Sequence, residues 1–310
     1  MSERANKLEG QSADFLEAVR PHYSEGTLGI HRVGMCRLAT FSAETGIFEA
    51  AELDEEAVSA FELWLQGRRL APTTVYRTIG TLKVFLRWAH KVGLCLWDGK
   101  DYRLPKPQDR SPVPPTAAVM AKVLELPDRG NPLGIRDLFV LELLYVLGLR
   151  RRECSGLDLA DLDLGAETLF VVGKYSDERL LPVGPTLEKT AWSYLRGARP
   201  RLAPSAGERA LLLGDGGKRL TPDAVGYIVK KYGAAVGIKL APHQLRHACA
   251  THLVEAGMEL EDVRRLLGHR SLDSTQRYAQ IHGREVRREF LRSHPRAGQS
   301  ECFSARGGFL

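Results

Sequence analysis

The chain has 310 residues, 44% of them hydrophobic, which is enough to bury the cores of two domains. Its 44 Lys and Arg exceed its 38 Asp and Glu, and the net charge of +6 is compatible with a polyanionic partner. Five scattered cysteines without a Cys-x-x-Cys pair argue against a disulfide framework and a thiolate metal cluster, and no segment resembles a signal peptide or membrane span, so a cytoplasmic protein is expected.

Apolar residues at helical spacing dominate the first hundred positions. Residues 57–65 and 73–89 show this spacing, and no stretch alternates as a half-buried strand does. A faint repeat predicts capping turns at 23–27 and 70–74, each opening an amphipathic helix. These patterns predict a small helical bundle over residues 10–101.

A proline-rich stretch at 102–116 separates this bundle from the rest of the chain. It holds five prolines within YRLPKPQDRSPVPP, which favour extended, solvated backbone, so we expect an interdomain linker. An apolar helix is predicted at 137–149, and a hairpin with strands at 168–172 and 179–183 joined by a tight turn. Helical patterns return at 185–196, 221–235, 243–256, 260–267 and 272–281. We therefore expect a second domain over 117–290, mostly helical with one small sheet, and a C-terminal tail over 291–310.

Two places in the second domain have the composition of a phosphate site. Pro242 suits the first turn of a helix, so that His243 and Arg246 share one face near its N-terminus. Unsatisfied N–H groups and the helix dipole favour an anion there. Arg150 offers a second guanidinium, and Glu153, three residues on, can orient it or a neighbour. Two arginines can clamp both non-bridging oxygens of one phosphodiester.

Further residues offer the remaining chemistry of phosphodiester cleavage. The reaction needs a nucleophile, a proton acceptor for it and a proton donor for the departing alkoxide. Tyr278, His243 and Lys174 have these capacities. His269, after a helix-ending glycine, can donate a hydrogen bond to the charge that develops on the phosphorane. No metal and no cofactor are expected, because the arginines can carry the electrostatics.

The order of these pieces resembles the tyrosine recombinase or phage integrase family. The matching stretches are GLRRRECSGL (148–157), VVGKYSDERLLPV (171–183), HQLRHACATHL (243–253), LLGHRSLDSTQRY (266–278) and HPRA (294–297). By position, the resemblance makes Arg150 the first catalytic arginine, Lys174 the hairpin lysine, His243 and Arg246 the His-x-x-Arg pair, His269 the second histidine and Tyr278 the nucleophile. It extends from Phe15 to Ala297 and is most similar to Xer-type members.

The resemblance implies a fold, a reaction and an assembly. The fold is a SAM-like helical core-binding domain followed by an α+β catalytic domain, and together they clamp the DNA duplex. The reaction is site-specific recombination through a 3′-phosphotyrosine and a Holliday junction, without metal or ATP. The assembly is a tetramer on double-stranded DNA with two recombination sites, formed by one chain or with a second recombinase. The segment after Tyr278, with a helix at 284–290, docks on a neighbouring copy in such assemblies.

The sequence departs from the family pattern at one position and leaves another open. Tyr175 follows the hairpin lysine where family members often carry glycine, which weakens the assignment of Lys174. Arg151 and Arg152 directly follow Arg150, although the frame Gly-Leu-Arg-x-x-Glu favours Arg150.

Other functions and sites remain as alternatives. A DNA-binding protein of recombinase fold without the chemistry, or a type IB topoisomerase, has many of the same features. His243 and His247 are four residues apart, but the Glu of a His-Glu-x-x-His zinc site is absent. The pairs Lys230-Lys231 and Arg264-Arg265 are equally compatible with contacts to DNA phosphates and with a solvated helix face.

Overall fold

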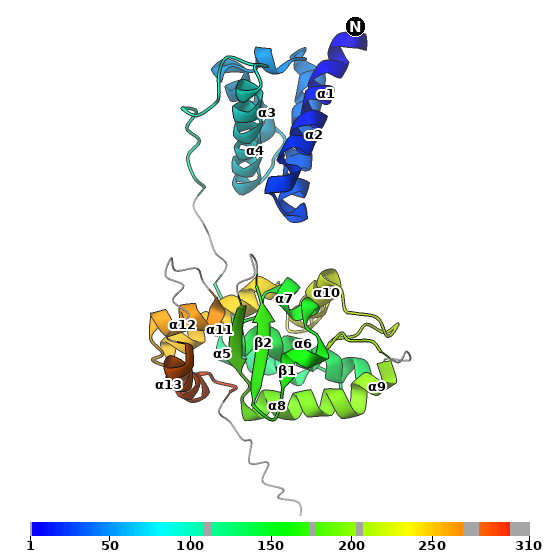
Figure 1. Ribbon diagram of the computed structural model, residues 1–310, viewed down its shortest axis with the longest axis vertical. Coiled ribbons are helices and arrows are strands. Elements are labelled where there is room, and N and C mark those ends of the chain that lie inside the picture. Colours follow the sequence, from blue (N-terminus) through cyan, green and yellow to red (C-terminus); the bar gives the residue numbers. More distant parts are fainter. Residues whose placement is uncertain (1, 108–112, 174–177, 203–206, 269–278, 298–310) are drawn as a thin grey trace, which may run out of the picture. The chain divides into compact units, whose positions relative to one another are not determined.

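A computed structural model describes residues 2–107, 113–173, 178–202, 207–268 and 279–297. The chain divides into two compact units, residues 1–111 and 112–310 (Figure 1). Both units are mainly helical, and a small antiparallel sheet belongs to the second, so the predicted fold class is confirmed. Within the described ranges, no helix combines the length and the apolar character needed to cross a bilayer.

The first unit is a bundle of helices around an aromatic core. Its main helices are α1 (Ser2–Val19), α2 (Glu25–Thr45), α3 (Glu55–Gly67) and α4 (Pro72–Lys91), with short 3₁₀ turns at Arg20–His22 and Ala50–Glu52. Phe15 packs edge-to-face on Phe85, and Phe41 packs on Phe61, with ring centroids 5.4 and 5.1 Å apart. All four rings are buried, which joins the four helices into one core.

The two capping turns predicted from the repeat have different outcomes. Ser24 caps α2, because its side chain accepts a hydrogen bond from the Thr27 N–H. The second prediction was wrong: α4 begins at Pro72, its N-cap residue Ala71 makes no side-chain cap, and Thr74 lies within the helix. This helix begins with proline instead. The N–H at the first helical position has no intrahelical partner, so proline, which lacks an N–H, loses nothing there.

Helix α6 (Pro132–Tyr145) forms the centre of the second unit. It is buried on nearly all sides and packs against α5 (Ala117–Glu125), α8 (Pro185–Trp192), α10 (Pro222–Ala235) and α11 (Pro242–Glu255). The prediction that this helix extends to residue 149 was wrong. It ends at Tyr145, and Gly148 adopts a left-handed φ of 60° that terminates helical geometry.

A three-stranded antiparallel sheet lies in the same unit. Its strands are β1 (Leu162–Asp163), β2 (Thr168–Val172) and β3 (Glu178–Pro182), in the order β1-β2-β3. Thr168 pairs with Pro182 and Val172 with Glu178, so the predicted hairpin is confirmed, with its second strand shifted by one residue. Leu169, Val171 and Leu181 turn to the core, as the two-residue period of a strand requires.

The remaining elements complete the second unit. They are α7 (Arg151–Gly156), a 3₁₀ turn at Leu159–Asp161, a π-helical stretch at Ser193–Ala198, α9 (Arg199–Leu202), α12 (Leu260–Leu267) and α13 (Ala279–Ser293). The predicted helix at 260–267 is confirmed by α12, whereas most of the one predicted at 272–281 lies outside the described residues. After α13, Ala297 joins the core and Arg296 forms an ion pair with the buried Glu142 at 3.1 Å.

Candidate active site

A turn after α6 sets the position of Arg150. A Cβ on Gly148 would lie 2.3 Å from the side chain of Leu267, and the left-handed φ disfavours any other residue, so both constraints select glycine. Arg150 then precedes α7 as its N-cap residue in extended backbone. Its side chain is 40% exposed, so the guanidinium is anchored by the protein and still reaches solvent.

Glu153, predicted to orient Arg150 or a neighbour, is buried in the first turn of α7. Its carboxylate accepts hydrogen bonds from the Arg150 backbone N–H at 2.9 Å and from Arg150 Nη1 at 2.6 Å. Arg179 of β3 donates to both carboxylate oxygens, at 3.2 and 2.8 Å. Burial raises the pKa of Glu153, but the hydrogen bonds and charge of Arg179 and the hydrogen bonds of Arg150 outweigh it and lower the pKa to about 2.

Helix α11 carries His243 and Arg246 near its N-terminus. Arg246 Nη1 donates to the Gly148 carbonyl at 2.6 Å, and its Nη2 donates to the Leu267 carbonyl. Burial, followed by the nearby positive charge of Arg150, lowers the pKa of Arg246 to about 10. The guanidinium nevertheless stays charged at neutral pH. His243 is exposed.

Three arginines hold the C-terminal end of α12. Arg179 Nε donates to the Leu266 carbonyl at 3.2 Å, Arg246 to that of Leu267, and Arg150 Nη2 to that of Gly268 at 3.0 Å. The last carbonyls of a helix lack intrahelical partners and carry the negative end of its dipole. The arrangement therefore satisfies these carbonyls and brings the guanidinium groups of Arg150 and Arg246 together.

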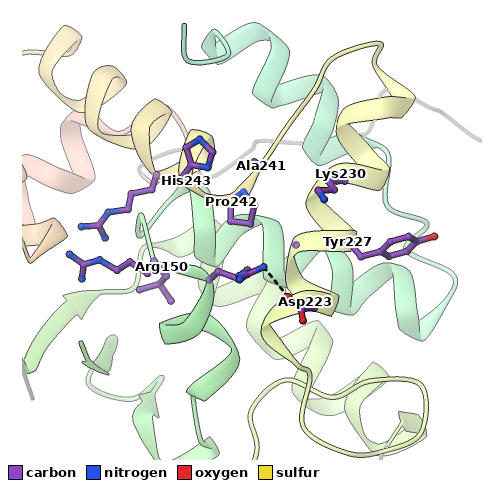
Figure 2. A pocket seen from close by; sticks show the side chains of 11 residues that line it. Arg150, Asp223, Tyr227, Lys230, Ala241, Pro242 and His243 are labelled. Carbon is purple, nitrogen blue, oxygen red and sulfur yellow. Dashed lines mark hydrogen bonds and ion pairs between the residues drawn. The ribbon is translucent and has the colours of Figure 1, made fainter. Parts of the chain in front are cut away.

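These side chains open on a pocket of about 860 Å³. Figure 2 shows Arg150 and His243 on one side of it and Tyr227 and Lys230 of α10 on the other. Its lining is Leu149, Arg150, Arg151, Asp223, Gly226, Tyr227, Lys230, Ala241, Pro242, His243 and Arg246. Arg151 pairs with Asp223 at 3.1 Å in an exposed contact. Four Arg and Lys against one Asp make this pocket suited to an anion.

The other predicted site residues are not part of this geometry. Lys174, His269 and Tyr278 lie outside the described residues. Their neighbours along the chain are described: β2 and β3 come before and after Lys174, Gly268 precedes His269, and α13 begins directly after Tyr278. The structure thus brings together Arg150, Glu153, His243 and Arg246, and the assignment of the other three remains a prediction.

Arg179 is a residue of the site that the sequence patterns did not identify. Its side chain is only 8% exposed and contacts both Glu153 and the end of α12. One signal was present in the sequence: Arg179 is two residues from the buried Leu181 and therefore belongs to the inward face of its strand. A charged side chain on the inward face of a strand needs a buried partner that pairs with its charge.

Both units of the chain resemble known protein families. Residues 116–284 match the model of the phage integrase family, and residues 9–100 match that of the phage integrase SAM-like domain. The chain is 36% identical over 256 residues to a tyrosine recombinase XerC of Pelotomaculum thermopropionicum, covering 80% of this chain and 83% of that relative. It is 33% identical over 301 residues to a tyrosine recombinase XerC of Oceanobacillus iheyensis, covering 94% and 98%.

Solved structures share the fold at lower sequence identity. A Tn1549 transposon integrase in complex with a circular intermediate DNA matches with a TM-score of 0.67 and 18% identity, covering 89% of this chain and 99% of that one. The XerH site-specific recombinase bound to palindromic difH substrate matches with a TM-score of 0.64 and 19% identity, covering 84% and 78%.

Proposed function

The chain belongs to the phage integrase family and is a tyrosine recombinase, and we propose that it cleaves and rejoins double-stranded DNA through Tyr278. The convergence of Arg150 and Arg246 on one pocket carries the proposal. Each guanidinium is anchored by backbone carbonyls at the end of α12, and both line the cavity next to His243. Two fixed guanidinium groups match the two non-bridging oxygens of a phosphodiester.

The proposed reaction exchanges one phosphodiester for another. The Tyr278 oxygen attacks the scissile phosphorus and passes its proton to His243 as general base, while the bond from phosphorus to the 5′ oxygen breaks. Lys174 donates a proton to the departing 5′ oxygen, and His269 donates a hydrogen bond to the phosphorane. The product is a 3′-phosphotyrosine and a free 5′-hydroxyl. Because the bond energy is kept in the phosphotyrosine, attack by a 5′-hydroxyl rejoins the strand without ATP.

Helix α10 supplies a second surface for the same DNA. Lys230 and Tyr227 line the pocket, and Tyr227 is 69% exposed. Lys231, the next residue, is engaged elsewhere: its Nζ lies 3.2 Å from Asp137 Oδ2, and Asp137 is buried. Of the two lysines, Lys230 is therefore the one that we propose for a phosphate contact.

The helical first unit is proposed to bind the same duplex. A cavity of about 360 Å³ between α2 and α4 is lined by Arg37 and Arg77 together with glycines, threonines and the apolar Ile30 and Val33. We further propose the assembly that the family resemblance implies, four copies on two recombination sites, with one chain or with a second recombinase, and action in the cytoplasm. Both XerH and the Tn1549 integrase are bound to DNA in the structures that match this fold.

A covalent adduct is the direct test of this function. Recombination sites are first selected by the chain itself from random duplexes, and a nicked suicide version of the selected site is then incubated with the protein in EDTA without ATP. We expect a protein–DNA adduct that survives SDS on a denaturing gel and is absent with Tyr278→Phe. Binding without an adduct would favour a DNA-binding protein without the chemistry. Relaxation of supercoiled DNA that lacks the site would favour a topoisomerase.

A further inference from the structure

The charged cluster beside the pocket contains three arginines and one glutamate. Arg150 and Arg246 line the pocket, whereas Arg179, among the described residues, does not. Arg179 directs two of its nitrogens to the Glu153 carboxylate and the third to the Leu266 carbonyl. Its side chain is 8% exposed, against 40% for Arg150, so Arg179 has no direct access to a DNA phosphate in this arrangement.

Glu153 creates an electrostatic conflict at this position. It accepts hydrogen bonds from the Arg150 backbone N–H and from Arg150 Nη1, and the second of these directs the guanidinium. A carboxylate 2.6 Å from Arg150 Nη1 also cancels much of the positive charge that a phosphate would meet. The conflict is greatest during reaction, because the phosphorane carries more negative charge on its non-bridging oxygens than the phosphodiester does.

Arg179 resolves this conflict through its own ion pair with Glu153. The pair has the two-nitrogen, two-oxygen geometry of a strong arginine–carboxylate contact, and the Glu153 side chain is only 4% exposed. With Arg179 present, the cluster has three positive charges against one negative charge, which leaves the charges of both Arg150 and Arg246 for the DNA. Without it, Glu153 would offset one of these two.

We infer that Arg179 is a positioning residue of the recombination reaction, which neutralises Glu153 so that this carboxylate orients Arg150 without weakening its attraction for the scissile phosphate. The inference rests on the proposed function, since it assumes that a DNA phosphate occupies the pocket. It assigns Arg179 no contact with DNA. Its effect is carried through Glu153 and Arg150.

The test compares two substrates within each variant. One is the selected suicide duplex, and the other carries a methylphosphonate at the scissile position, which has the same shape but no negative charge. For Arg179→Gln, which keeps a hydrogen-bond donor and removes the charge, we expect cleavage of the native duplex to fall roughly 10- to 100-fold and that of the methylphosphonate less than about threefold. For Arg179→Lys, which keeps the charge, the ratio of the two rates should stay within about threefold of wild type.

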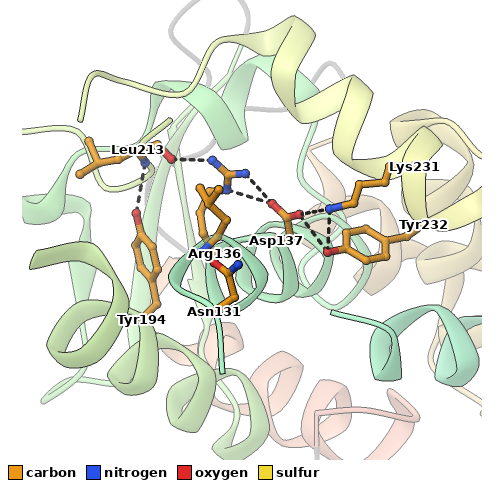
Figure 3. Close-up of polar contacts among 8 residues, drawn as sticks. Asn131, Arg136, Asp137, Tyr194, Leu213, Lys231 and Tyr232 are labelled. Atoms are coloured by element: carbon orange, nitrogen blue, oxygen red, sulfur yellow. Dashed lines mark hydrogen bonds and ion pairs between the residues drawn. The ribbon is translucent and has the colours of Figure 1, made fainter. Parts of the chain in front are cut away.

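Arg136 offers a matched control in the same unit. Like Arg179, it is nearly buried and donates to a carboxylate, that of Asp137, and to a backbone carbonyl, that of Leu213 (Figure 3). It is not among the pocket residues of the described chain. Arg136→Gln should therefore lower stability without changing the ratio of the two rates. If Arg179→Gln gives the same ratio as Arg136→Gln, Arg179 is merely structural and the inference is overturned.

Two further measurements cover the remaining outcomes. If Arg179→Gln does not fold, Glu153→Gln replaces it. Because this variant removes the anion, the cleavage rate of the native duplex relative to that of the methylphosphonate should rise by about threefold or more. An unchanged ratio would again overturn the inference. If the wild-type chain cleaves neither duplex, the proposed chemistry fails. Equilibrium binding of the same two duplexes then replaces cleavage, and Arg179→Gln should lower the affinity for the native duplex more than the affinity for the methylphosphonate.

Discussion

At the scale of single residues, the site depends on contacts between positions far apart in the sequence. Arg150 and Arg246 were identified from motif spacing, because each lies in a short sequence pattern at the beginning of a helix. Arg179 was not, because its partners Glu153 and Leu266 are 26 and 87 residues away. Such pairings arise only when strand, turn and helix end meet, and periodicity in one segment does not encode them.

Gly148 permits a direct test of how tightly this arrangement is constrained. In Gly148→Ala, the new Cβ meets Leu267 at 2.3 Å and the residue must also hold a left-handed φ. We expect the free energy of unfolding to fall by about 2–4 kcal/mol, of which about 1–2 come from the backbone and the rest from overpacking. Urea unfolding measures the change. The control is Gly237→Ala, because Gly237 has a similar φ of 75° but no atom near the position of a Cβ. This variant should lower the free energy of unfolding only by the backbone contribution. Equal losses would show that the contact with Leu267 is unimportant.

At the scale of secondary structure, periodicity predicted most helices of the chain and the hairpin. The helix at 260–267 and the pairing of 168–172 with the next strand follow from local apolar spacing alone. The two errors have local causes that spacing does not reveal: Pro72 starts α4 in place of a hydroxyl cap, and Gly148 ends the apolar run before Leu149. Helix α1 was not predicted, because polar residues interrupt its apolar pattern over Ser2–Val19.

Adjacent lysines on α10 have different environments and should behave differently on substitution. Lys230 lines the pocket, whereas Lys231 pairs with Asp137, which also accepts a hydrogen bond from Tyr232 at 2.9 Å (Figure 3). Lys230→Gln should weaken DNA binding and reduce the slope of log affinity against log salt by about 1, with little effect on stability. Lys231→Gln should leave that slope unchanged and lower the melting temperature. Salt titrations of DNA binding, alongside thermal unfolding, distinguish the two. Identical salt slopes would remove Lys230 from the proposed DNA surface.

At the scale of the whole molecule, the last described residues belong to the core of the second unit. Phe290 and Ala297 are fully buried, and the His294 ring lies 4.9 Å from that of Tyr145 on α6. The ion pair between Arg296 and Glu142 also joins this segment to α6. The HPRA stretch of the sequence is thus a point of attachment to the central helix. The division into two helical units, in contrast, was foreseeable from the proline-rich stretch and the change in pattern after it.

His294 predicts an acid sensitivity of the second unit. Burial lowers its pKa from 6.5 to about 3 in the folded chain. Between these values the unfolded chain binds a proton that the folded chain does not, so stability falls as the pH drops from about 6.5 toward 3. In His294→Asn, the dependence of the unfolding free energy on pH between 6 and 4 should be weaker by up to about 1.4 kcal/mol per pH unit. Parallel curves for the wild type and this variant would contradict the prediction.

The attachment of α10 has a consequence for how target choice can change. Its Asp223, Gly226, Tyr227 and Lys230 line the pocket, while Tyr232 and Lys231 both contact Asp137 on α6 and so hold the helix in place. The positions that line the pocket, where we propose contact with DNA, and the position that anchors the helix are thus separate. Tyr227 and Lys230 can therefore be substituted without breaking the contact with Asp137, so new site preferences can arise by drift or by library selection while the helix stays attached to α6.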